Sequence, residues 1–135
     1  MRKEGNEFGS TTGRPRRCGW LDLPALKYSI MINGVTQLFM MKADVLNIFE
    51  EIKVCTAYEL PSGEKIEKLP FEINELDAKP VYKTMKGWYC SLDGVSTYEE
   101  FPAPLKAYVA FLEQELQVPI KLVSIGPDRT QTIMR

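Results

Sequence analysis

The stretch Leu38-Phe39-Met40-Met41-Lys42-Ala43-Asp44 decides the fold class that this sequence predicts. Its first four residues are all apolar, and the run is too short for a helix. It therefore predicts a buried strand that is covered on both faces, as in a parallel sheet. The run ends abruptly in Lys42 and Asp44. A charged pair directly after a buried strand lies at the carboxyl edge of the sheet, where open α/β sheets bind their ligands.

Helices and further strands are predicted on both sides of this strand. The clearest pattern is a helical stripe of Leu105, Tyr108, Val109, Leu112 and Leu116. The expected elements are a helix over 22–33, a strand over 38–41, a short helix over 45–51, a strand over 52–60 with Val54, Thr56, Tyr58 and Leu60 on one face, a hairpin partner over 65–69, an extended segment over 81–88, a helix over 104–116 and a strand over 120–123. This order predicts an α/β fold with a mixed, largely parallel sheet, flanking helices and a β-hairpin.

The composition fits one domain with a real hydrophobic core. The chain has 135 residues, of which 44% are hydrophobic and 26% charged, and its formal net charge is −1. This balance gives no overall field that points to nucleic acid or to a membrane. Positive charge is concentrated in residues 1–20, where five basic and two acidic side chains leave a net charge of +3.

Several motifs are missing from the chain. No apolar run approaches the ~20 residues that a membrane span needs, and no secretory signal follows Met1, so a cytoplasmic location is expected. Cys18, Cys55 and Cys90 are widely spaced and form no C-x-x-C pair, which argues against a disulfide framework and against a zinc site. There is no histidine and no G-x-x-x-x-G-K-[ST] phosphate loop, so imidazole acid–base chemistry is not available from this chain.

The basic stretch Ser10-Thr11-Thr12-Gly13-Arg14-Pro15-Arg16-Arg17 has the residue types of an anion-binding loop. Arginine pairs bidentately with carboxylate or phosphate, and backbone amides beside a glycine add further donors. Threonine hydroxyls can donate to the same anion. The alternative is a solvated basic loop, and the residue types alone do not separate the two.

The ends of two predicted strands suggest a guanine site. A carboxylate such as that of Asp44 can accept from both the N1–H and the 2-amino group of guanine, and the stem of Lys42 can lie along the base. A second loop, Ser124-Ile125-Gly126, follows the strand over 120–123 and could offer a backbone N–H to the guanine O6. The alternative for the K-x-D pattern is an ion pair at a strand end that is exposed to water.

Longer motifs place the chain near a known family. Glu7-Phe8-Gly9-Ser10-Thr11-Thr12-Gly13-Arg14-Pro15-Arg16-Arg17-Cys18-Gly19-Trp20 closely resembles the signature of adenylosuccinate synthetases. Lys42-Ala43-Asp44-Val45-Leu46 resembles the K-x-D-V-L guanine loop of that family, and Ser124-Ile125-Gly126-Pro127-Asp128-Arg129 resembles its S-x-G-P-D-R segment. The resemblance spans essentially the whole chain. It implies that residues 1–135 are the C-terminal portion only of such an enzyme, with a fold that is P-loop-NTPase-like overall.

The resemblance implies a GTP-dependent ligase that joins IMP and L-aspartate to form adenylosuccinate, the first committed step of AMP synthesis from IMP. It also implies Mg²⁺ as cofactor of the full enzyme, a cytoplasmic homodimer, and no nucleic-acid or membrane partner. Family members carry their phosphate loop and their catalytic aspartate and histidine in an N-terminal part. No catalytic residue and no metal ligand is therefore expected in this chain, which alone should be inactive.

The resemblance also implies roles for individual residues. The aspartate loop, residues 7–20, would bind L-aspartate through Ser10, Thr11, Thr12, Gly13, Arg14, Pro15 and Arg16. Arg14 would also contact IMP. GTP would be bound by Arg16, Lys42, Ala43, Asp44, Ser124, Ile125 and Gly126. Three positions depart from the family pattern, because Met41 and Ala43 replace an expected threonine and leucine, and Ser10 replaces a more usual alanine.

A function of a different class fits the same basic segment. The chain could be an isolated guanine-nucleotide or RNA-binding module that uses the arginines of residues 14–17. It lacks an RNA-binding signature, however, and residues 21–135 carry a net charge of −4, which does not favour binding to a polyanion.

Overall fold

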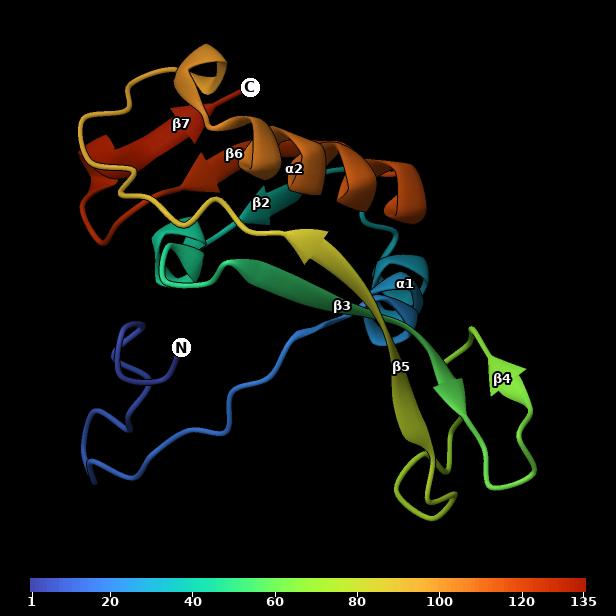
Figure 1. Ribbon diagram of the computed structural model, residues 1–135. Coiled ribbons are helices and arrows are strands. Elements are labelled where there is room, and N and C mark those ends of the chain that lie inside the picture. Colours follow the sequence, from blue (N-terminus) through green and yellow to red (C-terminus); the bar gives the residue numbers. More distant parts are fainter.

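The computed structural model describes all residues 1–135, and it has a mixed α/β fold with two sheets and two α-helices (Figure 1). The elements in chain order are β1 (Leu21–Asp22), α1 (Leu23–Asn33), β2 (Leu38–Met40), a 3-10 helix (Ala43–Leu46), β3 (Glu51–Glu59), β4 (Lys65–Ile66), β5 (Lys79–Lys86), a 3-10 helix (Tyr98–Glu100), α2 (Ala103–Leu116), β6 (Ile120–Ser124), a 3-10 helix (Arg129–Gln131) and β7 (Thr132–Met134). No helix is both long enough and apolar enough to cross a membrane.

The first sheet has the strand order β2-β6-β7. β2 and β6 run parallel, with Met40 opposite Val123, whereas β6 and β7 are antiparallel. The parallel pairing of the strand over 38–41 is confirmed. Its expected burial on both faces is wrong, because β2 is an edge strand and Phe39 in it is 56% exposed.

The second sheet is built around β3. β5 pairs antiparallel with the full length of β3, from Glu51 opposite Lys86 to Glu59 opposite Lys79. Because β5 takes one edge of β3, the short strands β1 and β4 share the other edge, β1 in parallel and β4 as the antiparallel hairpin partner. The mixed α/β fold and the hairpin are thus confirmed, but parallel pairing is limited to β1 with β3 and β2 with β6.

A register shift in β3 changes which residues face the core. The shift lies between Cys55 and Ala57, opposite β5. Ile52 and Val54 are buried before it, whereas Ala57 and Tyr58 are both buried beyond it. A bulge adds one residue to a strand and so breaks the period of two. The expectation of one continuous face over 54–60 is therefore wrong.

The two longer predicted helices form with the expected ends, whereas the short helix expected over 45–51 is replaced by the 3-10 helix Ala43–Leu46. Asp22 caps α1 by accepting from the Ala25 N–H at 3.1 Å, and Pro24 lies in the first turn, where a missing N–H costs nothing. Gly34 ends the helix, and its N–H donates to the Ile30 carbonyl. α2 buries the predicted stripe of apolar residues, and the Glu113 carboxylate accepts from the Ile120 N–H at 2.7 Å, so the helix end is tied to the start of β6.

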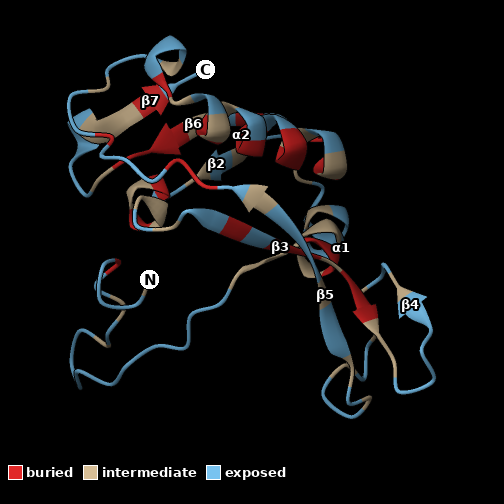
Figure 2. Cartoon of the chain, in the orientation of Figure 1, coloured by how far each residue is buried: buried red, intermediate tan, exposed pale blue.

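The core lies between α2 and the two sheets, as the buried residues in Figure 2 show. Leu105 and Val109 of α2 are fully buried with Val123 of β6 and Val54 of β3. Trp88 closes one side of the core, where its indole N–H donates to the Asn47 side chain at 2.6 Å. One apolar cluster therefore joins both sheets and fixes the strand ends that follow β2 and β6.

Candidate functional site

The two strand ends singled out in the sequence lie side by side. Residues 42–44 (the first strand-end loop) follow β2, and residues 124–126 (the second strand-end loop) span the last residue of β6 and the two that follow it. Because β2 and β6 are parallel neighbours with Met40 opposite Val123, both loops lie at the same carboxyl edge of the sheet. The expected adjacency of the two loops at one edge of the sheet is thus confirmed, although β2 is less buried than expected.

Asp44 in the first strand-end loop has a carboxylate oxygen without a partner. Lys42 adopts a left-handed conformation with φ of 60°, which turns the chain into the 3-10 helix Ala43–Leu46. Ala43 is fully buried beneath the loop and anchors it. The Asp44 Oδ1 atom is buried and accepts no hydrogen bond. A buried acceptor of this kind is costly unless a donor reaches it, so the geometry is suited to a ligand that brings N–H groups.

The second strand-end loop is held rigidly by its own chain. The Ser124 hydroxyl donates to the Gly126 carbonyl at 2.9 Å, and the Ile125 N–H donates to the Gln131 carbonyl at 2.9 Å. A Cβ at position 126 would lie 2.2 Å from Gln131 Oε1, so the loop and the Gln131 side chain fit closely around a glycine. The Gly126 N–H makes no hydrogen bond within the chain, which leaves it available to a ligand acceptor.

The arginine loop (residues 7–20) begins as a small hairpin. Phe8 and Pro15 form an antiparallel bridge, and the Arg16 N–H donates to the Glu7 carbonyl at 3.0 Å. Within it the Gly9 N–H donates to the Arg14 carbonyl at 2.8 Å. The exposed tip consists of the predicted aspartate-binding residues Ser10, Thr11, Thr12 and Gly13. The hairpin therefore presents hydroxyls and arginines to solvent at one end.

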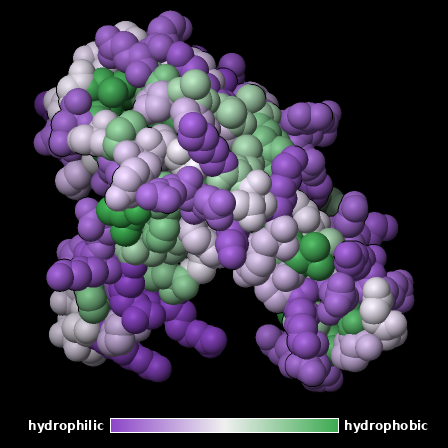
Figure 3. Space-filling model, viewed as in Figure 1, coloured by the Kyte–Doolittle hydropathy of each residue, from purple (hydrophilic) through white to green (hydrophobic).

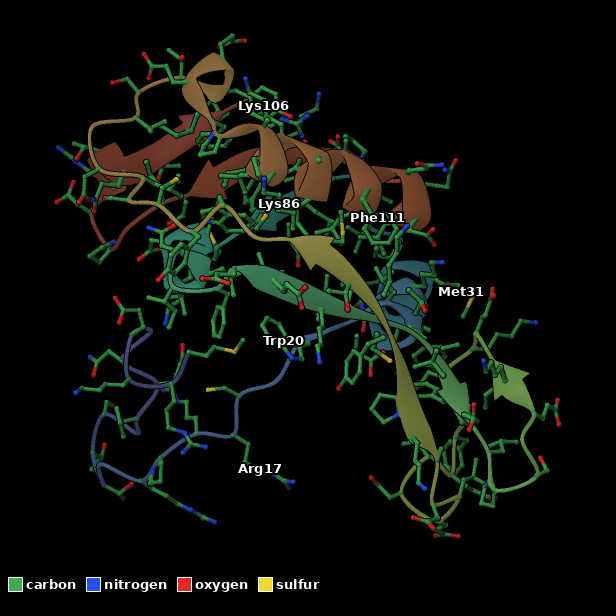
Figure 4. The ribbon with its side chains drawn as sticks, in the orientation of Figure 1. Arg17, Trp20, Met31, Lys86, Lys106 and Phe111 are labelled. Atoms are coloured by element: carbon green, nitrogen blue, oxygen red, sulfur yellow. The ribbon has the colours of Figure 1, made fainter.

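The arginines of the loop differ in their partners. Arg14 is exposed, and its guanidinium makes no hydrogen bond or ion pair within the chain. Arg16 pairs with Glu7, whose Oε2 lies 3.0 Å from the guanidinium NH1. Arg17 points away from the body of the fold (Figure 4). Of the three, Arg14 and Arg16 flank the rigid hairpin base and are the better placed to bind an anion.

Glu7 brings the arginine loop and the first strand-end loop together. Its Oε1 accepts from the Lys42 ammonium, which also donates to the Gly5 carbonyl at 3.0 Å. The hydrogen bond from Lys42, and then that from Arg16, lowers the pKa of the Glu7 carboxyl below its ordinary value. The sequence around Glu7 does not reveal this bridge, because Glu7 and Lys42 are 35 residues apart in the chain.

The far end of the arginine loop is packed onto the fold. The rings of Trp20 and Phe49 meet edge to face with centroids 5.1 Å apart, so Trp20 anchors the end of the loop. Between the loop and the body lies a mostly apolar cavity of about 620 Å³, lined among others by Arg16, Lys42 and Trp20. Figure 3 shows the loop, at the lower left, standing apart from the far ends of β3, β4 and β5 at the lower right.

No group of three or more acidic or cysteine side chains in residues 1–135 is close enough together to hold a metal ion. The residues of the site therefore do not form a magnesium site by themselves. One unpartnered carboxylate oxygen, one free backbone N–H and two arginines are groups suited to binding a nucleotide base or an anion.

Comparison with known proteins gives one consistent result. A sequence model described as adenylosuccinate synthetase matches residues 1–133. Adenylosuccinate synthetase of Cytophaga hutchinsonii is 59% identical over 135 residues, a match that covers all of this chain and 31% of the relative. That of Flavobacterium psychrophilum is 58% identical, with 32% of the relative covered. The chain thus spans about a third of the length of the curated relatives it matches.

A solved structure agrees with these sequence matches. The structure of fully ligated adenylosuccinate synthetase from Plasmodium falciparum superposes with a TM-score of 0.92 at 38% identity. The match covers 99% of this chain and 32% of that chain. The arrangement of both sheets, the two helices and the loops between them is therefore shared with that protein.

Proposed function

Because the chain belongs to the adenylosuccinate synthetase family, we propose that it supplies the guanine-binding and aspartate-binding loops of a GTP-dependent ligase. The ligase joins IMP and L-aspartate to form adenylosuccinate. The chain corresponds to about a third of a relative, so the reaction belongs to a longer protein. That this third is the C-terminal portion stays a prediction of the resemblance.

The buried, unpartnered Oδ1 of Asp44 carries the proposal. Guanine presents two N–H donors side by side, at N1 and at the 2-amino group, and a carboxylate accepts from both. The O6 acceptor of the same base then faces the neighbouring loop, where the Gly126 N–H is free. Adenine has neither the donor pair nor the O6 acceptor, so this arrangement of charges and dipoles favours GTP over ATP.

The arginine loop supplies the anion-binding half of the site. Aspartate carries two carboxylates, and a guanidinium binds a carboxylate through two parallel hydrogen bonds. In the proposed arrangement Arg14 and Arg16 hold aspartate, with Arg14 also reaching IMP and Arg16 reaching GTP. Of the other aspartate-loop residues, Ser10, Thr11, Thr12 and Gly13 form the exposed tip of the same hairpin, and Pro15 lies at its base opposite Phe8.

Other parts of the reaction are assigned to residues outside this chain. In the proposed reaction GTP phosphorylates the IMP O6, and the aspartate amine then displaces that phosphate. The residues described here do not fit a Mg²⁺ site, and they include no histidine. We therefore propose that the metal ligands, the catalytic acid and base, and the phosphate loop lie in the other two thirds of the enzyme, which we propose acts as a cytoplasmic homodimer.

The substitution Asp44→Asn in the full-length enzyme tests the guanine assignment. Xanthine replaces the 2-amino group of guanine with a carbonyl, to which an asparagine amide can donate but a carboxylate cannot. We expect the ratio of kcat/KM for GTP to that for XTP to fall at least about tenfold, the size of a hydrogen bond to a charged group. Asp77→Asn, on the exposed loop before β5, is the matched control and should leave the ratio unchanged. An unchanged preference in Asp44→Asn would remove Asp44 from the site.

The isolated RNA-binding module is the weaker alternative. The match of residues 1–133 to an enzyme family and the adjacency of the two strand-end loops both favour the ligase. Calorimetric titration of the chain with GTP, ATP and single-stranded RNA separates the two functions. Tight, salt-sensitive RNA binding without a preference for GTP would favour the module.

A further inference from the structure

The Glu7 side chain joins Arg16 of the arginine loop to Lys42 of the first strand-end loop. One of its carboxylate oxygens accepts from the Arg16 guanidinium and the other from the Lys42 ammonium. Glu7 itself is well shielded, with its side chain 23% exposed, whereas those of Arg16 and Lys42 are 59% and 52% exposed. A single carboxylate therefore joins two cations that belong to separate loops.

Backbone contacts on both sides of Glu7 hold its side chain in this position. The Glu7 carbonyl accepts from the Arg16 N–H at 3.0 Å, so the two residues face each other at the base of the hairpin. Gly5, two residues earlier, is buried, and a Cβ there would lie 3.4 Å from Val45 in the 3-10 helix Ala43–Leu46. The segment before the arginine loop is thus packed directly on the 3-10 helix that begins in the first strand-end loop.

The contacts of Lys42 explain how the bridge would act on a bound base. Its ammonium is held between the Gly5 carbonyl and the Glu7 carboxylate, so its end cannot swing freely. The methylene stem is then kept in place beside Asp44, where it can lie along the plane of a base. Arg16 is restrained through the same carboxylate on its other side.

We propose that Glu7 is a positioning residue that couples the guanine-binding and aspartate-binding loops by restraining Lys42 and Arg16 at the same time. This inference rests on the proposed function, because it concerns binding of GTP and aspartate to those loops. A base that packs against the stem of Lys42 fixes the ammonium, and through Glu7 it fixes Arg16 in the orientation that receives a carboxylate. By linkage, bound aspartate must raise the affinity for GTP by the same factor by which bound GTP raises the affinity for aspartate.

The test uses the full-length enzyme with Glu7→Gln and Glu7→Asp. Glutamine keeps the length of the side chain but removes its charge, and aspartate keeps the charge but is too short to reach both cations. We expect KM for GTP and KM for aspartate to rise together in both variants, by about three- to tenfold, the effect of losing one or two exposed charged pairs. The dependence of the aspartate KM on GTP concentration should also weaken.

Glu4→Gln is the matched control. Glu4 is exposed and makes no hydrogen bond, and the substitution removes the same charge three residues away from Glu7. It should leave both KM values unchanged. In the background of Lys42→Met, Glu7→Gln should add little to the rise in KM for GTP, since the two residues act through one contact. A residue that only stabilised the fold would lower the active fraction and leave the KM values alone.

The proposal is overturned if Glu7→Gln behaves like Glu4→Gln, if its effect on the GTP KM adds fully to that of Lys42→Met, or if it lowers the GTP KM. The last result would mean that Glu7 competes with the nucleotide for the two cations. Failure of the proposed function is a separate outcome, because it is read from base preference in Asp44→Asn, and Asp44 makes no hydrogen bond to Glu7.

Discussion

The Tyr58 hydroxyl donates to the Asp22 carboxylate, with its oxygen 2.7 Å from Oδ2 and 2.8 Å from Oδ1. The same carboxylate caps α1 through the Ala25 N–H. Tyr58 belongs to β3, and Asp22 is the last residue of β1, directly before α1 and two residues after the arginine loop. This hydrogen bond therefore fixes the point at which the arginine loop leaves the fold.

Tyr58→Phe removes the hydroxyl and should lower the free energy of unfolding by about 2 kcal/mol, as expected for a hydrogen bond to a charged group that is partly shielded from water. Tyr82→Phe is the matched control, because Tyr82 lies opposite the neighbouring Cys55 and its hydroxyl makes no hydrogen bond. Denaturant unfolding measures both variants. Equal stability of the two would show that the bond to Asp22 contributes nothing.

Stability should fall at alkaline pH. Burial, followed by the hydrogen bond to Asp22, raises the pKa of Tyr58 above its ordinary value. Burial alone raises the pKa of Tyr108 to about 12. Since the folded pKa exceeds the unfolded value of about 10, the stabilisation is complete below pH ~10 and is lost as the pH rises through the folded pKa.

Unfolding by denaturant at a series of pH values checks this alkaline loss. Tyr58→Phe should show a shallower loss than the wild type above pH ~10, because one of the two groups no longer titrates. Parallel curves for the variant and the wild type would exclude Tyr58 as a source of the pH dependence.

Arg14→Leu in the full-length enzyme should raise KM for aspartate at least about tenfold, because a charge-assisted bidentate contact is lost. KM for GTP should change less, since Arg14 is not among the proposed GTP-binding residues. Arg17→Leu is the comparison, because its side chain points away from the body of the fold in Figure 4. Steady-state kinetics with aspartate as the varied substrate decides the question, and a normal aspartate dependence in Arg14→Leu would contradict the assignment.

Gly87→Ala should destabilise the protein by about 2 kcal/mol or more through steric overlap. A Cβ at this position would lie 2.0 Å from the Phe49 carbonyl oxygen, and the Gly87 N–H donates to the Glu50 carbonyl at 2.7 Å. The backbone on both sides is therefore fixed and cannot yield cheaply. Gly19→Ala is the control, because no atom lies within 4 Å of the added Cβ there. Thermal unfolding should separate the two variants clearly.

The purified chain of residues 1–135 should form no adenylosuccinate from IMP, aspartate and GTP. It contains no histidine and no phosphate loop, so the proposed phosphoryl transfer has neither its imidazole nor its phosphate cradle. Chromatographic detection of adenylosuccinate checks this expectation, with the full-length enzyme as the positive control. Product formed by the chain alone would refute it.

Local sequence patterns were sufficient to predict individual helices and strands and the positions of their ends. The caps of α1, the apolar stripe of α2 and the strand before Lys42 are all short-range features, and each was predicted correctly. The adjacency of residues 42–44 and 124–126 could also be anticipated, because parallel strands place their carboxyl ends on one edge.

Long-range pairing could not be read in the same way. The sequence predicts a regular alternation of buried and exposed side chains along β3, but the bulge opposite β5 interrupts this alternation after Cys55. Phe39 was expected inside the sheet and lies at its edge, because an apolar run does not reveal how many neighbours the strand has. The full pairing of β5 with β3 depends on contacts that no local window contains.

By itself, the sequence determined the family and the two helices, because motifs and caps depend on neighbours along the chain. Only the tertiary structure decided that Asp44 Oδ1 is buried without a partner and that Glu7 joins Arg16 to Lys42. Both facts depend on which segments of the chain contact each other in the fold. Those tertiary contacts, and not residue type alone, determine whether a polar atom is buried and which ion pairs form.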